Sequence, residues 1–269
     1  MSDPLPADFA AALAVSRGRR RRLGDPIHYF AEVTSTNDVA AAFAERGANE
    51  GTTILAAAQT AGRGRLGRSW HSPTDAGLYV SVVFRDATVA PYLTLAGGVA
   101  VAEGIRAATG LPAEIKWPND VVTRSANGPA RRRKLAGILA EASTSSDGLQ
   151  YVILGMGINL RPTAFPPELA DRASSIEAEL GRAVEPAALL VEVLATLAAE
   201  TASLSAGNPR ALLNHWRALA PLACGTAVEC DGPHGRVSGM AAGIADDGAL
   251  LVRVGAGLER IVAGEVIWK

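Results

Sequence analysis

Residues 59–70 read Gln-Thr-Ala-Gly-Arg-Gly-Arg-Leu-Gly-Arg-Ser-Trp, between apolar stretches that end at Ala58 and begin at Leu78. Glycine tolerates positive φ and lets the backbone approach a ligand closely, and the arginine fork matches carboxylates and phosphates. A run in which glycine and arginine alternate predicts a loop that holds an anion with more than one negative centre. The alternative is a disordered Gly-Arg tract, but such tracts are seldom bracketed by strands.

The composition is that of a globular protein with a hydrophobic core. The chain has 269 residues, of which 48% are hydrophobic and 20% are charged, with a formal net charge of −1. This length suits one large domain, or a large domain with a small one. The near-zero charge gives no global attraction to nucleic acid or to an anionic membrane.

The cysteines, histidines and N-terminus add further expectations. Cys224 and Cys230 have no metal-ligand spacing, so we expect reduced structural thiols. No chemistry is assigned to the scattered His28, His71, His215 and His234. The start Met-Ser-Asp-Pro-Leu-Pro has no leader pattern, and we see no apolar run of about 18 residues. These features predict a cytoplasmic protein.

The first half of the chain predicts alternating strands and helices. Strands are expected at 27–33, 52–59 and 77–84. A helix is expected at 39–46, where Ser35 and Asp38 have the spacing of a capping box, and a second at 92–109. Gly47 and Gly110 follow these helices as the glycines that commonly end one.

The second half continues this pattern and then changes. A short strand at 114–117 is stopped by Pro118, and 134–142 with 151–159 predict an antiparallel pair. Helices are expected at 186–205 and 208–218. Residues 221–269 consist of short β-like pieces, which predict a small barrel-like appendage.

Four more polar clusters lie where strands end. They are Ser35-Thr36-Asn37, Lys116-Trp-Pro-Asn-Asp120, Lys134 with Gly137, and Gly155-Met-Gly157-Ile-Asn159. Each also has an ordinary explanation: helix capping for the first, a turn for the second, a strand edge for the third and a glycine bulge for the fourth. Two arginine runs, 17–22 and 131–134, are typical of a solvated surface or loop, although the second adjoins a strand.

Taken together and in this order, the clusters resemble the biotin protein ligase family. The specific motifs are Gly-Arg-Gly-Arg-x-Gly-Arg-x-Trp and Lys-Trp-Pro-Asn-Asp, and the resemblance covers about residues 27–269, including Asp246-Asp-Gly-Ala-Leu250 and Gly264-Glu-Val266. It implies an α+β fold with a mixed, largely antiparallel central sheet and helices, like that of class II synthetases, and a small C-terminal SH3-like β-barrel. The implied divisions are 1–26, a short N-terminal segment that could be flexible, 27–219, a catalytic biotin- and ATP-binding domain, and 220–269, the SH3-like domain.

The resemblance also implies an activity. The family joins biotin to MgATP to give biotinyl-5′-AMP, and then transfers biotin to a lysine of a biotin carboxyl carrier domain of a carboxylase. Fixed guanidiniums suit this chemistry because they offset the repulsion between the biotin carboxylate and the α-phosphate. The Gly/Arg loop would then act as a lid that orders over the adenylate and excludes water.

Site residues follow from the matching motif positions. The resemblance implies catalytic roles for Arg63, Lys134 and Arg65. It implies biotin contacts for Ser35, Thr36, Asn37, Gln59, Arg63, Gly64, Arg65, Lys134, Gly137 and Leu139. It implies ATP contacts for Arg65, Arg68, Trp70, Lys116, Asn119 and Asn159, and Asp120 is the candidate for placing Mg²⁺.

Some features depart from the family or leave alternatives open. About 26 residues precede the first strand, too few for the N-terminal DNA-binding domain that some members carry, so we expect no DNA partner. Leu66 replaces an arginine found in some members, and 123–133 is a long connection of unassigned role.

The alternative functions are a lipoate or octanoate ligase on a related fold, a non-catalytic biotin sensor and a nucleic-acid-binding module. The expected state is a monomer or weak homodimer without a membrane partner.

Overall fold

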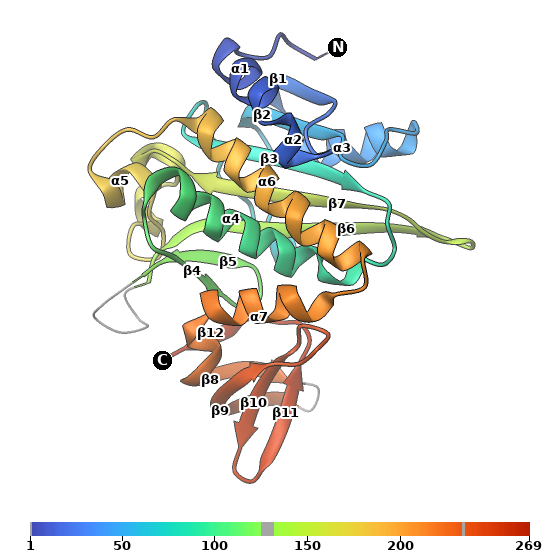
Figure 1. Ribbon diagram of the computed structural model, residues 1–269. Coiled ribbons are helices and arrows are strands. Elements are labelled where there is room, and N and C mark those ends of the chain that lie inside the picture. The colour runs from blue at the N-terminus through green and yellow to red at the C-terminus, as the bar shows by residue number, and fades with distance from the viewer. Residues whose placement is uncertain (1, 125–131, 233–234) are drawn as a thin grey trace.

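A seven-stranded mixed sheet forms the centre of the protein (Figure 1). The computed structural model describes residues 2–124, 132–232 and 235–269. The strand order is β1-β2-β3-β7-β6-β5-β4, in which β1 and β2 are parallel and the other neighbours are antiparallel. The bounds are β1 Ile27–Val33, β2 Thr53–Gln59, β3 Gly77–Phe84, β4 Ala113–Lys116, β5 Asp120–Thr123, β6 Lys134–Ser145 and β7 Gly148–Asn159. This mixed sheet with its helices confirms the predicted α+β fold.

Helices cover both faces of the sheet. Helices α4 (Leu93–Thr109) and α6 (Pro186–Ser205) pack on one face, and α3 (Thr36–Glu45) packs on the other. Side chains alternate across a strand. In β7, therefore, Leu154 joins the larger apolar core while Ile153 joins the smaller one beneath α3. Apolar residues on both faces explain why the central strands are almost continuously hydrophobic.

Helix α6 is long and apolar enough to span a membrane by length and composition alone. It packs beside α4, and the fully buried Leu189, Leu190 and Leu197 point to a core helix. These properties are weak support for a membrane span, because core helices of globular proteins share them.

The N-terminal residues contain two helices, α1 (Ala7–Val15) and α2 (Arg17–Arg20), that pack against α6. The amide of Asp3 donates to the Tyr29 carbonyl at the outer edge of β1 (2.8 Å). In the first arginine run, Arg19 pairs with Glu192 of α6 (2.6 Å) and Arg20 is only 2% exposed. Part of this run therefore holds α2 in place.

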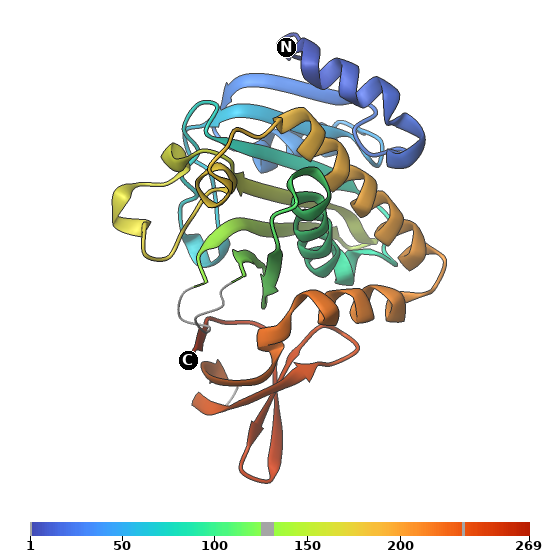
Figure 2. The ribbon, with the colours of Figure 1, turned by 60° about the vertical axis from the view of Figure 1, so that its left-hand side comes forward.

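A second sheet follows helix α7 (Pro209–Leu219), and Figure 2 shows it below that helix. Its order is β11-β10-β9-β8-β12, with bounds β8 Cys224–Gly232, β9 Gly235–Ile244, β10 Leu250–Val254, β11 Gly257–Ile261 and β12 Val266–Trp268. Within the described residues β11 and β12 remain the two edges, so the sheet predicted as an SH3-like β-barrel does not close. Three-residue β12 pairs with β8 at the edge opposite β11. Cys224 and Cys230 are free thiols.

Candidate functional site

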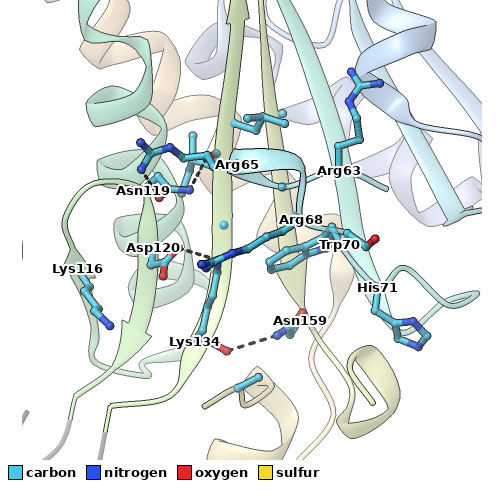
Figure 3. A pocket seen from close by; sticks show the side chains of 18 of the residues that line it. Arg63, Arg65, Arg68, Trp70, His71, Lys116, Asn119, Asp120, Lys134 and Asn159 are labelled. Carbon is cyan, nitrogen blue, oxygen red and sulfur yellow. Dashed lines mark hydrogen bonds and ion pairs between the residues drawn. The ribbon is translucent and has the colours of Figure 1, made fainter. Parts of the chain in front are cut away.

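One cavity of about 770 Å³ collects the candidate residues from all five polar segments. Its walls include every site residue that the sequence singled out: Ser35, Thr36, Asn37, Gln59, Arg63, Gly64, Arg65, Arg68, Trp70, Lys116, Asn119, Asp120, Lys134, Gly137, Leu139 and Asn159. Figure 3 shows ten labelled lining residues, which come from the Gly/Arg loop and the residue after it, from the end of β4, the turn that follows it and the start of β5, from the start of β6, and from the end of β7. Segments more than a hundred residues apart in sequence thus share one space.

Residues of the Ser35-Thr36-Asn37 turn form hydrogen bonds with other segments of the protein. The Thr36 amide donates to Gln59 Oε1 (2.8 Å), and Asn37 Nδ2 donates to Glu141 Oε2 (2.5 Å). Among the described residues, Ser35 accepts no capping hydrogen bond from the first turn of α3. The capping-box interpretation is therefore wrong, because Asp38 pairs with Arg63 instead.

The glycines of β7 lie in unbroken ladders. Gly155 and Gly157 are in register with β3 on one side and with β6 on the other, so the bulge interpretation is wrong. A methyl group at Gly155 would overlap the Asn37 amide, and one at Gly157 would overlap the Trp70 indole. Glycine is needed here because side chains of other segments lie on the strand backbone.

Each arginine of the Gly/Arg loop has a different partner. Arg63 pairs with Asp38 and with Glu141 (2.8 Å), and its guanidinium is directed away from Lys134 and Asp120 (Figure 3). Arg65 donates to Asn119 Oδ1 (3.2 Å), and burial lowers the pKa of Arg65. Arg68 pairs with Glu265, the residue before β12 (2.5 Å). The hydrogen bond that Arg63 donates to the Glu141 carboxylate raises the pKa of Arg63.

Three more charged groups line the cavity: Lys116, Asp120 and Lys134. Lys134 Nζ is 2.7 Å from Asp120 Oδ1 and 5.0 Å from the centre of a Trp70 ring. Burial lowers the pKa of Lys116, which lines the same cavity. Asp120 and Glu265 offset the charges of Lys134 and Arg68, but cations outnumber carboxylates in the lining of the cavity, so this wall suits a polyanion.

The second arginine run is largely neutralised by internal pairs. Arg132 pairs with buried Glu114 (2.7 Å), and Arg133 pairs with Glu179 of α5, Ile176–Leu180 (2.5 Å). Arg131, most of the long 123–133 connection, and His234 lie outside the described residues.

Asn159 is 3% exposed, and its amide nitrogen is already used. Nδ2 donates to the Ser174 carbonyl (3.0 Å) and, more weakly, to the Lys134 carbonyl (3.4 Å). Asn159 thereby ties β7 to β6 and to the segment before α5 at the edge of the cavity.

Some residues of this region received no site role from the sequence. Glu265 and Val266, which belong to the Gly264-Glu-Val266 motif, line the cavity together with Trp268 and with His71, which received no chemistry. Glu141 and Ser81 bond to Asn37 from behind the cavity wall. Local spacing cannot reveal these contacts, because they join strands distant in sequence.

The described residues contain no cluster of three or more metal-ligating side chains. Asp120 is a single carboxylate beside several cations, which is too few ligands for a resident metal cage. It fits a cation that arrives bound to phosphates, since Mg²⁺ takes one or two carboxylates along with phosphate oxygens.

Comparison with known proteins identifies two matching families. Residues 29–159 match the Biotin/lipoate A/B protein ligase family, and residues 224–268 match the Biotin protein ligase C terminal domain. The chain is 33% identical over 249 residues to the bifunctional ligase/repressor BirA of Bacillus subtilis, covering 91% of this chain and 74% of that protein. It is 36% identical over 247 residues to the biotin–[acetyl-CoA-carboxylase] ligase of Mycobacterium tuberculosis, covering 88% of this chain and 86% of that one.

A solved structure has the same fold. The biotin protein ligase from Aquifex aeolicus in complex with biotin and ATP superimposes with a TM-score of 0.75 at 28% identity, covering 90% of this chain and 98% of that chain.

Proposed function

Because the chain belongs to the biotin protein ligase family, we propose that it forms biotinyl-5′-AMP from biotin and MgATP and then transfers biotin to a lysine of an acceptor protein. The observation that carries this proposal is the single cavity lined by the Ser-Thr-Asn turn, the Gly/Arg loop and the Lys-Trp-Pro-Asn-Asp motif. ATP-dependent biotin ligation is the activity of the family, and the match of residues 224–268 favours its biotin branch.

The biotin end is assigned to the polar wall at the start of α3. Thr36, Asn37 and Gln59 offer both donors and acceptors there, as a ureido ring requires. Ser35, Gly64, Gly137 and Leu139 complete this wall. The biotin carboxylate would then face Arg63, Arg65 and Lys134.

The ATP end is assigned to the basic wall. Lys116, Arg68 and Asn119 would hold the phosphates, while Trp70 and Asn159 would lie on the nucleoside side. Asp120 would hold Mg²⁺ brought in with ATP, and that ion would neutralise phosphate charge. The cations of this wall reduce the repulsion between the two reacting anions.

The reaction divides into two displacements. A biotin carboxylate oxygen forms a bond to the α-phosphorus as the bond to the β-phosphate oxygen breaks, and pyrophosphate leaves. The neutral amine of the acceptor lysine then attacks the carboxyl carbon, AMP leaves, and the amine loses a proton. No nucleophile of this chain is required, so the cavity serves to orient substrates and exclude water.

The remaining assignments concern partners and location. The acceptor is a biotin carboxyl carrier domain of a biotin-dependent carboxylase, and no DNA or membrane partner is invoked. We propose residues 27–219 as the catalytic unit, residues 220–269 as an appended unit, a cytoplasmic location, and a monomer or weak homodimer.

Biotin-dependent exchange of labelled pyrophosphate into ATP tests the proposal. Exchange should appear with biotin and should not appear with lipoate or octanoate. Addition of a carrier domain should then yield a biotinylated lysine. Exchange with lipoate alone would assign the chain to the lipoate ligases, which share the matched family.

A further inference from the structure

Glu141 is a carboxylate of β6 that joins two elements of the proposed biotin wall from behind. Its Oε2 atom accepts from Asn37 Nδ2 (2.5 Å) and from Arg63 (2.8 Å). Asn37 is 5% exposed and lies in the first turn of α3, whereas Arg63 lies at the start of the Gly/Arg loop. Glu141 is not among the residues that line the cavity, so it would act on a ligand only through these neighbours.

A carboxylate can only accept hydrogen bonds, and this fixes the direction of the Asn37 amide. Because Asn37 Nδ2 faces Glu141, its Oδ1 faces Ser81 Oγ, 2.6 Å away. Ser81 has a single hydroxyl proton, and Oδ1 can only accept it. Ser81 therefore donates to Asn37.

The same reasoning fixes the directions of the hydrogen bonds of Thr36 and Gln59. Thr36 Oγ1 is 2.8 Å from Ser81 Oγ, whose proton is already used, and 3.1 Å from Gln59 Oε1. Both neighbours act as acceptors, so the Thr36 proton points into the protein. The lone pairs of Thr36 remain free to accept from a group in the cavity. Gln59 Oε1 also accepts from the Thr36 amide, which turns Gln59 Nε2 toward Ser72 (2.8 Å).

We propose that Glu141 is a positioning residue that sets the donor and acceptor pattern of the ligand-recognition wall. This inference rests on the proposed biotin ligase function. With Glu141 present, the wall holds one pattern, in which Thr36 accepts from a ligand N–H. With a neutral amide at 141, the Asn37 amide can turn over and the Ser81 hydroxyl can change its acceptor. The wall then samples two patterns of donors and acceptors.

Asp38 provides a matched comparison. Its carboxylate pairs with the same Arg63, while the Asn37 amide donates to Glu141. Asp38→Asn thus weakens the hold on Arg63 and keeps the Asn37 bond. Glu229→Gln removes a paired carboxylate from the C-terminal sheet, far from this wall.

The experiment measures biotin-dependent ATP–pyrophosphate exchange for the wild type and for Glu141→Gln, Glu141→Asp, Asp38→Asn and Glu229→Gln. Glu141→Gln should raise KM for biotin about tenfold, with kcat and KM for ATP changed less than about threefold, as expected for a lost charge-assisted bond. Glu141→Asp keeps an acceptor-only group and should recover part of the loss. Asp38→Asn and Glu229→Gln should leave KM for biotin within about twofold of the wild type, well below a tenfold effect.

A ligand analogue separates hydrogen-bond direction from simple loss of structure. An analogue of biotin in which the ring N–H that faces Thr36 is replaced by oxygen has no donor for the Thr36 lone pairs, so a wall with one pattern should prefer biotin strongly. The ratio of the two KM values should fall in Glu141→Gln and stay constant in Glu229→Gln. Thermal unfolding of each variant reports its fold directly.

Three results would overturn the inference. The first is a KM ratio in Glu141→Gln that equals that of the wild type, and the second is a rise of KM for biotin in Asp38→Asn as large as that in Glu141→Gln. The third is a loss of activity toward biotin and ATP alike in both Glu141 variants, together with a lower melting temperature. A wild type with no biotin-dependent exchange would instead overturn the proposed function, and the inference with it.

Discussion

Gly157 of β7 lies against the indole of Trp70, and a methyl group at Gly157 would come within 2.5 Å of Trp70 Nε1. Its register partner in β6 is Gly137, where a methyl group would come within 3.0 Å of the same ring. The paired glycines thus form a flat floor beneath Trp70. The last residue of the Gly/Arg motif is thereby seated on two strands that the motif itself does not contain.

Gly157→Ala should displace the Trp70 ring and impair the nucleotide side of the proposed site. We expect KM for ATP to rise about tenfold, with KM for biotin changed less than about threefold. Overpacking should also reduce the free energy of unfolding by about 1–3 kcal/mol. Pyrophosphate exchange and urea unfolding measure both effects.

Gly18→Ala is the control, because a methyl group at Gly18 of α2 meets open space. A Gly157→Ala enzyme with wild-type KM for ATP would show that Trp70 does not contact the nucleotide.

Removing Arg63 or Lys134 should lower adenylate formation while the fold survives. Arg63→Ala or Lys134→Ala is expected to cost at least about tenfold in rate, about 1.4 kcal/mol of barrier. Both side chains are partly exposed, and exposed ion pairs contribute little to stability, so unfolding should change little. Lys269→Ala, which removes an ion-paired lysine outside the cavity, should retain full exchange. If both site variants exchange pyrophosphate like the wild type, the proposed site is wrong.

Sequence periodicity was sufficient for most of the large elements. The helix expected at 92–109 is α4, which ends at Gly110 in a left-handed conformation (φ 79°). The expected pair 134–142 and 151–159 is the longer β6–β7 hairpin. Long segments with a clear apolar period are predictable because burial of one face dominates their energetics.

Contacts between distant segments were not predictable in this way. The turn residues Ser35 and Asp38 have capping spacing, but Arg63 competes for Asp38 across 25 residues. The two open edges of the C-terminal sheet were not predicted, because edge pairing depends on which strands meet in space. Glu141 was missed for the same reason, since its partners lie 78 and 104 residues away.

Arg20 should matter for stability and not for catalysis. Its guanidinium donates to Ser16 Oγ (2.9 Å) and to the carbonyls of Leu13 (2.6 Å) and Leu23, and it is almost fully buried. Arg20→Ala leaves these acceptors unpaired and should reduce the free energy of unfolding by about 3 kcal/mol. Chemical denaturation measures this, and exposed Arg22→Ala is the control. Equal stability of the two variants would contradict a structural role for the first arginine run.

The affinity for ATP should depend on pH through Lys116. Burial lowers the pKa of this ammonium, so it loses its proton at a lower pH than an ordinary lysine. The charged form favours phosphate binding, and KM for ATP should therefore be constant at low pH and rise as pH increases through the lowered pKa. Kinetics between about pH 7 and about pH 10 should show this rise below the usual lysine range. Lys116→Arg keeps its charge throughout and should flatten the profile, whereas Lys116→Met should raise KM for ATP at every pH. An unchanged alkaline rise in Lys116→Arg would assign the titration to another group.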